Sequence, residues 1–154
     1  MRFEINYDDK KVNRELSYDE TYDNIDVKPI PRYAYLMQLN YLEINVLENG
    51  RVICAGGLSD LSKAKRTSLT IPDYREGSLT VVSKLDPDFG TYQINRSPWP
   101  IWINPNTGWA CIGDPAIQGQ AVEFVSNCVA VLDHVGNLKA LWLKPDQLPI
   151  PDDT

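Results

Sequence analysis

The sequence predicts a mainly β protein, built either as an antiparallel β-sandwich or as a small β-barrel. Its 154 residues are the length of one ordinary domain. Short apolar segments alternate with polar positions and are separated by Gly, Pro, Asn and Asp, which is typical of strands joined by turns. No long segment keeps the apolar period of an amphipathic helix, so strands are expected throughout the chain.

The composition divides the chain into three parts. Residues 1–32 are polar and rich in tyrosine, and we interpret them as an N-terminal arm. Residues 33–147 contain the repeated apolar segments and are predicted to form the antiparallel β domain. Residues 148–154 are rich in proline and acidic residues and are expected to be a frayed tail.

Two short elements are predicted within the arm. Phe3 and Ile5 alternate with polar neighbours and predict a strand over Arg2–Asn6. Ser17 and Glu20 have the spacing of a capping box, which predicts a short helix near residues 17–24. The apolar face of this helix would be thin, so we expect the arm to pack loosely on the β domain.

The clearest unit in the sequence is a β-hairpin. Apolar and polar residues alternate over Leu42–Val46, and a second apolar segment follows over Arg51–Ala55. Between them, Asn49-Gly50 is a pair that tolerates the positive φ angles of a tight hairpin turn. Counting outward from this turn places Val46 opposite Ile53.

Several shorter elements follow the hairpin. One helical turn is predicted near Ser59–Lys63, just after two glycines that end the preceding strand. The further strands are predicted over Thr67–Ile71, Ser78–Leu85, Thr91–Asn95 and Trp109–Ile112.

The last strands of the domain are apolar on both faces. They are predicted over Gln120–Val125, Cys128–Asp133 and Leu138–Leu143, with a bulge or bend near Ser126-Asn127 where the apolar phase shifts. Strands of this kind are central in a sheet, or belong to a wall whose outer face is covered by another segment.

The charge and the cysteines limit the class of protein. A net charge of -6 argues against binding to duplex nucleic acid and to an anionic membrane surface, since both need a basic footprint. No run of apolar residues approaches the length of a membrane span, and the first thirty residues do not resemble a secretory signal. Together with three widely spaced cysteines, this predicts a cytoplasmic protein with reduced thiols.

A metal site or a reactive thiol is not expected. Cys54, Cys111, Cys128 and His134 make up a nominal Cys3His set, but they are separated by 57, 17 and 6 residues, so no two of them form a local ligand pair. The default for such cysteines is a buried, inert thiol, and His134 lies beside a turn at the surface. The sequence has no P-loop, dinucleotide fingerprint or serine-hydrolase motif, so neither a cofactor nor an enzyme is predicted.

Two acidic residues, Glu123 and Glu43, are candidate functional carboxylates. Glu123 lies between Val122 and Phe124 on an apolar strand, where it is either a perturbed acid or an edge residue beside a cation. Glu43 and Asn45 share one face of the hairpin and could line a pocket. A carboxylate-based enzyme is the third of our functional hypotheses.

A proline-rich segment holding three of the four tryptophans is the best candidate binding site. The prolines favour an extended backbone, on which Trp99, Ile101 and Ile103 point to one side and Trp102 to the other. Together with Trp109 these indoles could form an exposed contact surface, or they could close one end of the fold as part of the core.

The sequence favours a small protein-interaction module that uses this Trp/Pro segment or a sheet edge. Its partner would be another protein or a second copy of the chain, as in a homodimer. The alternative is a small-ligand binder whose pocket is lined by Trp99, Trp102 or Trp109.

Overall fold

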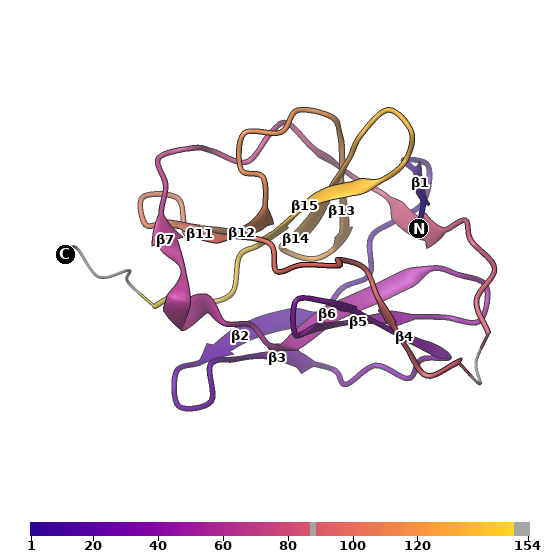
Figure 1. Ribbon diagram of the computed structural model, residues 1–154, viewed down its shortest axis with the longest axis horizontal. Helices are drawn as coiled ribbons and strands as arrows, with labels where there is room; N and C mark the ends of the chain where they lie inside the picture. Colours follow the sequence, from indigo (N-terminus) through magenta and orange to yellow (C-terminus); the bar gives the residue numbers. More distant parts are fainter. Residues whose placement is uncertain (87–88, 150–154) are drawn as a thin grey trace.

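Two β-sheets lie face to face in the computed structural model of the chain and enclose the main hydrophobic core (Figure 1). The structure describes residues 1–86 and 89–149. Of the two architectures that the sequence leaves open, the chain adopts the two-layer sandwich.

The upper layer in Figure 1 is a seven-stranded sheet and the lower layer is a six-stranded sheet. The order of the seven-stranded sheet is β7 (Lys65–Arg66), β11 (Ile101–Asn104), β12 (Trp109–Gly113), β15 (Leu138–Leu143), β14 (Cys128–Leu132), β13 (Gln120–Val125) and β8 (Arg75–Glu76). The order of the six-stranded sheet is β10 (Thr91–Gln93), β4 (Tyr35–Leu39), β5 (Leu42–Val46), β6 (Val52–Leu58), β3 (Asn24–Lys28) and β2 (Glu15–Asp19). A separate antiparallel pair joins β1 (Phe3–Asn6) to β9 (Ser78–Val81), and the 3-10 turn η1 spans Leu61–Lys63.

Strand alternation builds the core between the two sheets. Ile44 and Val46 point inward from β5, and Leu141 and Leu143 point inward from β15, all of them buried in one cluster. Side chains two residues apart share a face of a strand, so the apolar positions of the sequence pattern meet across the interface. Burying one such side chain stabilises the fold by about 1.5–3 kcal/mol.

The predicted hairpin is formed by β5 and β6, but its register differs from the expectation. Val46 pairs with Val52 rather than with Ile53, because Ile53 is the extra residue of a β-bulge. The carbonyl of Ile53 accepts a hydrogen bond of 3.0 Å from Nε of Arg14, a residue almost forty positions earlier. The β5–β6 ladder leaves the carbonyl of Ile53 without a backbone partner, and the side chain of Arg14 supplies the missing donor. Residue counting outward from the turn could not predict this bulge, because it depends on a residue outside the hairpin.

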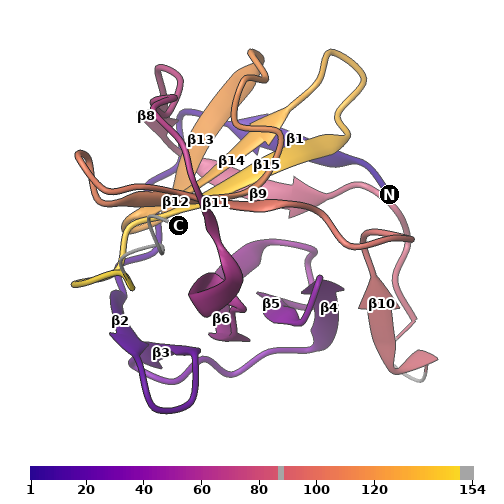
Figure 2. The ribbon, with the colours of Figure 1, turned by 60° about the vertical axis from the view of Figure 1, so that its left-hand side comes forward.

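The outer face of the seven-stranded sheet is also apolar, and a crossing segment covers it. Between β7 and β8, which lie at opposite edges of the sheet, residues 67–74 cross this face, as Figure 2 shows. Ile71 packs on the outer cluster, and Nδ2 of Asn104 donates a hydrogen bond of 2.9 Å to the carbonyl of Leu69. A strand predicted over Thr67–Ile71 is therefore wrong: this segment is the cover that the two-sided apolar strands require.

The N-terminal residues belong to the sandwich. The predicted strand at the start of the chain is confirmed as β1. The short helix predicted near residues 17–24 is wrong, because this stretch holds most of β2, a turn and the first residue of β3. Between β1 and β2, the backbone N–H of Val12 donates to the carbonyl of Phe124 in the seven-stranded sheet. The arm, expected to pack loosely, thus contacts both layers.

The sheets are mixed rather than purely antiparallel. Three short edge strands pair in parallel with their neighbours, namely β10 with β4, β7 with β11 and β8 with β13. The segment that joins β7 to β8 crosses the face of the sheet from one edge to the other. The two strands are therefore not joined to their sheet neighbours by a hairpin turn, which would make the pairing antiparallel. The strands predicted over residues 78–85 and 91–95 are shorter than expected and end at Val81 and Gln93.

Two expectations concern the ends and the compartment. In the described residues, no helix has the length and hydropathy needed to cross a membrane. The frayed tail predicted over residues 148–154 falls mostly outside the described residues, which end at 149.

Candidate functional site

Trp99 and Trp102 line the same surface hollow, whose volume is about 530 Å³. Both indoles are half-buried. Trp99 packs against the core between the sheets, whereas Trp102 packs against the cluster on the outer face. The remaining lining residues are Pro100, Gly113, Asp114, Pro115, Ile117 and Lys139.

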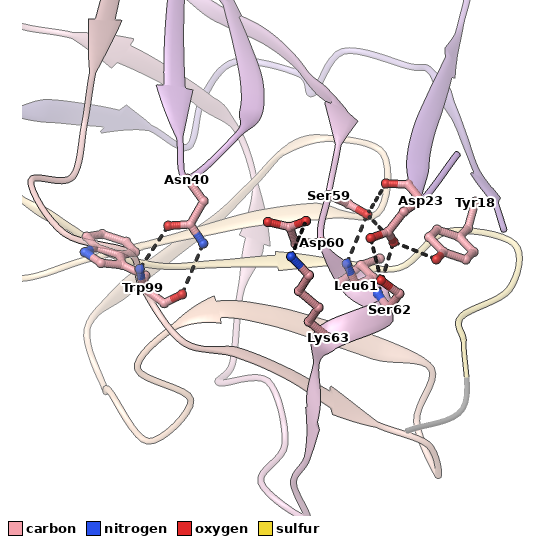
Figure 3. A network of polar contacts seen from close by, with 9 residues as sticks. All are labelled: Tyr18, Asp23, Asn40, Ser59, Asp60, Leu61, Ser62, Lys63 and Trp99. Carbon is pink, nitrogen blue, oxygen red and sulfur yellow. Dashed lines mark hydrogen bonds and ion pairs between the residues drawn. The ribbon is translucent and has the colours of Figure 1, made fainter. Parts of the chain in front are cut away.

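The backbone of Trp99 is held in place by one asparagine side chain. Oδ1 of Asn40 accepts a hydrogen bond of 2.9 Å from the N–H of Trp99, and Nδ2 of Asn40 donates at 3.1 Å to the carbonyl of Trp99 (Figure 3). Nδ2 of Asn95 in turn donates to Oδ1 of Asn40 at 2.7 Å. The first tryptophan of the site is therefore presented on an ordered backbone.

The ring of Trp99 lies close over a strand of the seven-stranded sheet. A Cβ built on Gly113 would be 3.1 Å from Cε3 of this indole, so the ring rests directly above the glycine backbone. Gly113 has a φ of 119°, which side chains rarely adopt. Both the close approach and the backbone angle explain why glycine stands at this position.

Two indole N–H groups are left without a partner. Nε1 of Trp102 and Nε1 of Trp142 are shielded from solvent and meet no acceptor among the described residues. A buried donor without an acceptor costs about 1–3 kcal/mol. Trp142 is fully buried in the outer cluster and is the one tryptophan that the sequence did not place in the candidate site.

Trp109 lies away from this hollow. It is 7% exposed, belongs to the outer cluster and meets the ring of Tyr74 edge-on, with 6.0 Å between the ring centroids. Nζ of Lys144 lies 5.9 Å from its centroid. The structure therefore brings Trp99 and Trp102 together and places Trp109 under the crossing segment.

A second polar network lies close to the Trp99 clamp and joins two turns. The carboxylate of Asp23 accepts hydrogen bonds from Tyr18 Oη at 2.7 Å, from Ser62 N at 3.0 Å and from Ser62 Oγ at 2.6 Å (Figure 3). Ser59 Oγ donates at 2.9 Å to the carbonyl of Asp23. These contacts fix the β2–β3 turn to the segment that leads from β6 into η1.

Glu123 serves the structure rather than an open site. Its Oε1 lies 2.9 Å from Nζ of Lys11, and its Oε2 accepts a hydrogen bond of 2.9 Å from the N–H of Asn127. The hydrogen bond to Glu123 raises the pKa of Lys11 above its ordinary value, against a smaller opposing effect of burial. Since both oxygens are engaged, we do not assign a catalytic role to this residue.

The cysteines and the histidine are not assembled into a site. Cys54, Cys111 and Cys128 are all buried and free. Burial raises the pKa of all three thiols, to about 11 for Cys54. His134 is exposed beside its turn. No group of metal-ligating side chains occurs among residues 1–86 and 89–149.

A separate hollow on the six-stranded sheet is lined by two polar residues that the sequence predicted to share one face of the hairpin. Glu43 and Asn45, which share one face of β5, both line it. Gly56 and Gly57 also line it. The expectation that these glycines end the strand is wrong, because β6 continues through both of them to Leu58. The signal available in advance was a buried-strand pattern in which asparagine stands between Ile44 and Val46.

No protein-family model matches the chain, and no curated protein matches it in sequence. The function is therefore inferred from the geometry alone.

Proposed function

We propose that this chain is a protein-interaction module that binds an extended, proline-containing segment of another protein between Trp99 and Trp102. The observation that carries the proposal is two half-buried indoles that share one open hollow with Pro100 and Pro115. Aromatic-lined grooves are the surfaces on which preformed polyproline segments dock. Such a segment loses little conformational entropy when it binds.

The rigidity of the site supports the same role. The Asn40 clamp and the close contact with Gly113 hold the indole of Trp99 before any ligand arrives. An ordered aromatic anchor avoids part of the entropy cost of association. The rim carries one acid, Asp114, and one base, Lys139, so it offers no net charge to select a charged partner.

The alternative of a small-molecule pocket lined by all three predicted tryptophans has less support. Trp109 does not line the hollow, and the hollow opens on the surface of the molecule rather than between the two sheets. Only the pair of Trp99 and Trp102 remains available to a ligand there.

The first test is an NMR titration with a ten-residue polyproline peptide. The four tryptophans give four indole N–H signals, which report separately on the site and on the outer cluster. We expect the signals of Trp99 and Trp102 to shift and those of Trp109 and Trp142 to stay in place. Absence of any shift at millimolar peptide, or shifts confined to Trp109 and Trp142, would refute the proposal.

A variant measures how much the anchor contributes. We expect Trp99→Ala to weaken peptide binding by about 2 kcal/mol, or roughly thirtyfold in Kd, as for a central aromatic contact. The matched control is Tyr22→Ala, which removes a 73% exposed aromatic ring from another part of the surface. Equal binding by the two variants would show that the indole is not the anchor.

Sedimentation of the wild-type chain distinguishes the partner. If the chain forms a dimer and Trp99→Ala abolishes it, the occupant of the hollow is a second copy, and the proposal of a foreign segment is wrong. A wild-type chain that stays monomeric while it binds the peptide supports the proposal.

A further inference from the structure

The second hollow, which belongs to the six-stranded sheet, has a volume of about 530 Å³. Two of its polar lining residues, Glu43 and Asn45, alternate along β5 with Ile44 and Val46, which point into the core between the sheets. The hollow therefore lies on the outer face of this sheet. Its remaining lining residues are Asn24, Ile25, Asp26, Val27, Lys28, Ile30, Pro31, Tyr33, Cys54, Gly56 and Gly57.

Asn45 has the features of a ligand contact. The residue is 5% exposed, it lines the hollow, and its amide makes no hydrogen bond to any of the described residues. The side-chain amide of a residue this buried is nearly always hydrogen-bonded within the protein, whereas the amide of Asn45 keeps contact with solvent in the hollow. The NH2 group and the carbonyl oxygen of Asn45 can therefore donate to and accept from a ligand in the hollow.

Two glycines, Gly56 and Gly57, leave space in the hollow that side chains would fill. A Cβ built on Gly56 would lie 2.6 Å from Cγ2 of Val27, so no other residue fits there without displacing a wall of the hollow. Gly57 has a φ of 91°, which also favours glycine. The missing side chains leave room beside Asn45 for a ligand to approach the backbone closely.

The rim around Asn45 combines free acceptors with exposed apolar surface. The carboxylate of Glu43 makes no hydrogen bond or ion pair within the described residues. Asp26 accepts one hydrogen bond, at 2.7 Å from Nδ2 of Asn24. Tyr33 is 50% exposed and Ile30 is 86% exposed, and both stand on the segment that walls the hollow. Acceptors therefore outnumber donors, and an aromatic ring lies beside them.

We propose that this hollow binds a sugar, which is a neutral ligand rich in hydroxyl groups. Each hydroxyl of a sugar can donate to Glu43 or Asp26 and can both donate to and accept from the amide of Asn45. The C–H face of the sugar ring is an apolar surface that matches the electron-rich face of the Tyr33 ring. Two acids against the single base Lys28 disfavour an anionic ligand. This site is separate from the Trp99–Trp102 hollow and does not depend on its function.

The test is an NMR titration of the full chain with glucose, galactose, mannose and N-acetylglucosamine, and with the methyl glycoside of each. We expect at least one sugar to shift the side-chain amide signals of Asn45 and the backbone signals of Gly56 and Gly57. Binding of the methyl glycoside as well indicates a glycan chain as the source, whereas binding of the free sugar alone indicates a free monosaccharide.

Variants decide whether Asn45 makes the contact. We expect Asn45→Leu to weaken sugar binding at least tenfold, the equivalent of one lost hydrogen bond. Tyr33→Ala, on an exposed segment, should weaken binding without lowering stability. The matched control is Asn106→Leu, which changes an exposed asparagine outside the hollow.

Three results would overturn the proposal. One is that no sugar shifts these signals at millimolar concentration. Another is that a protonated amine such as spermidine shifts them while the sugars do not, which would make the hollow a cation site. The last is that Asn45→Leu and Tyr33→Ala both bind sugar as tightly as the wild type does.

Discussion

Replacing Asp23 by asparagine tests the network that joins the β2–β3 turn to η1. The carboxylate accepts hydrogen bonds from Tyr18, from the backbone and hydroxyl of Ser62, and from Ser59 Oγ at 3.4 Å. Asp23 has a φ of 54°, in the left-handed region that asparagine also tolerates. Asp23→Asn therefore changes the charge and one acceptor atom while it keeps the shape and the backbone.

The expected loss follows from the chemistry of these bonds. A hydrogen bond to a charged group contributes about 1.5–3 kcal/mol, and a neutral amide retains one oxygen that still accepts. The amide nitrogen, however, meets a hydroxyl that donates in the wild type. We expect Asp23→Asn to lower the free energy of unfolding by about 2 kcal/mol, which corresponds to a fall in Tm of roughly 4–8 °C for a domain of this size.

The pH dependence of the stability difference between wild type and Asp23→Asn is a second test of the same network. Burial raises the pKa of Asp23, but hydrogen bonds from Ser62, Tyr18 and Ser59 outweigh it and hold the pKa below its ordinary value of 3.8. A carboxyl with a depressed pKa stabilises the folded state above its unfolded pKa, and this contribution is lost as the pH falls through the folded pKa. The stability difference between wild type and Asp23→Asn should therefore be full at neutral pH and should shrink below about pH 4.

Urea unfolding of both proteins across this pH range measures the effect. The matched control is Asp60→Asn, since Asp60 has a φ of 57° and, within the described residues, its side chain forms only a 3.9 Å ion pair with the exposed Lys63. We expect this control to change stability by less than about 0.5 kcal/mol. If the two variants are equally stable, or if the difference at Asp23 does not depend on pH, the reasoning about the network is wrong.

Two further predictions concern buried groups. Glu123→Gln should destabilise the fold by about 1 kcal/mol and return the pKa of Lys11 toward its ordinary value, because the ion pair at 2.9 Å is lost. Urea unfolding and NMR titration of the lysine check this, and a variant as stable as the wild type would contradict it. The three thiols should not react with an aromatic disulfide reagent at mildly alkaline pH in the folded chain, since they are buried and the pKa of Cys54 is about 11. All three should react when the chain is unfolded in denaturant. Rapid reaction of any thiol in the native chain would contradict this.

Much of the sandwich can be predicted from local patterns. The alternation over Leu42–Val46 and the turn at Asn49-Gly50 predicted the hairpin, and the extended Trp/Pro segment predicted that Ile103 and Trp102 face opposite sides of the sheet. These predictions hold because the period of a strand and the φ preferences of turn residues act between near neighbours in the chain.

Other features depend on residues far apart in sequence. Ser17 and Glu20 have capping-box spacing, yet Ser17 lies in strand β2. This strand pairs with β3, and its buried side chains, Leu16 and Tyr18, alternate as a strand requires. The capping box describes one turn of helix, and sheet pairing over five residues outweighs it.

The sequence by itself determined the fold class, the main hairpin and the need for a cover on the two-sided apolar strands, because these follow from the order of apolar, polar and turn residues. The tertiary structure decided which segment forms that cover, where the bulge at Ile53 lies, that Trp109 is separated from Trp99, and that Asn45 is left open on the outer face. Each of these depends on contacts across dozens of residues, whose register is set only when the whole chain is packed.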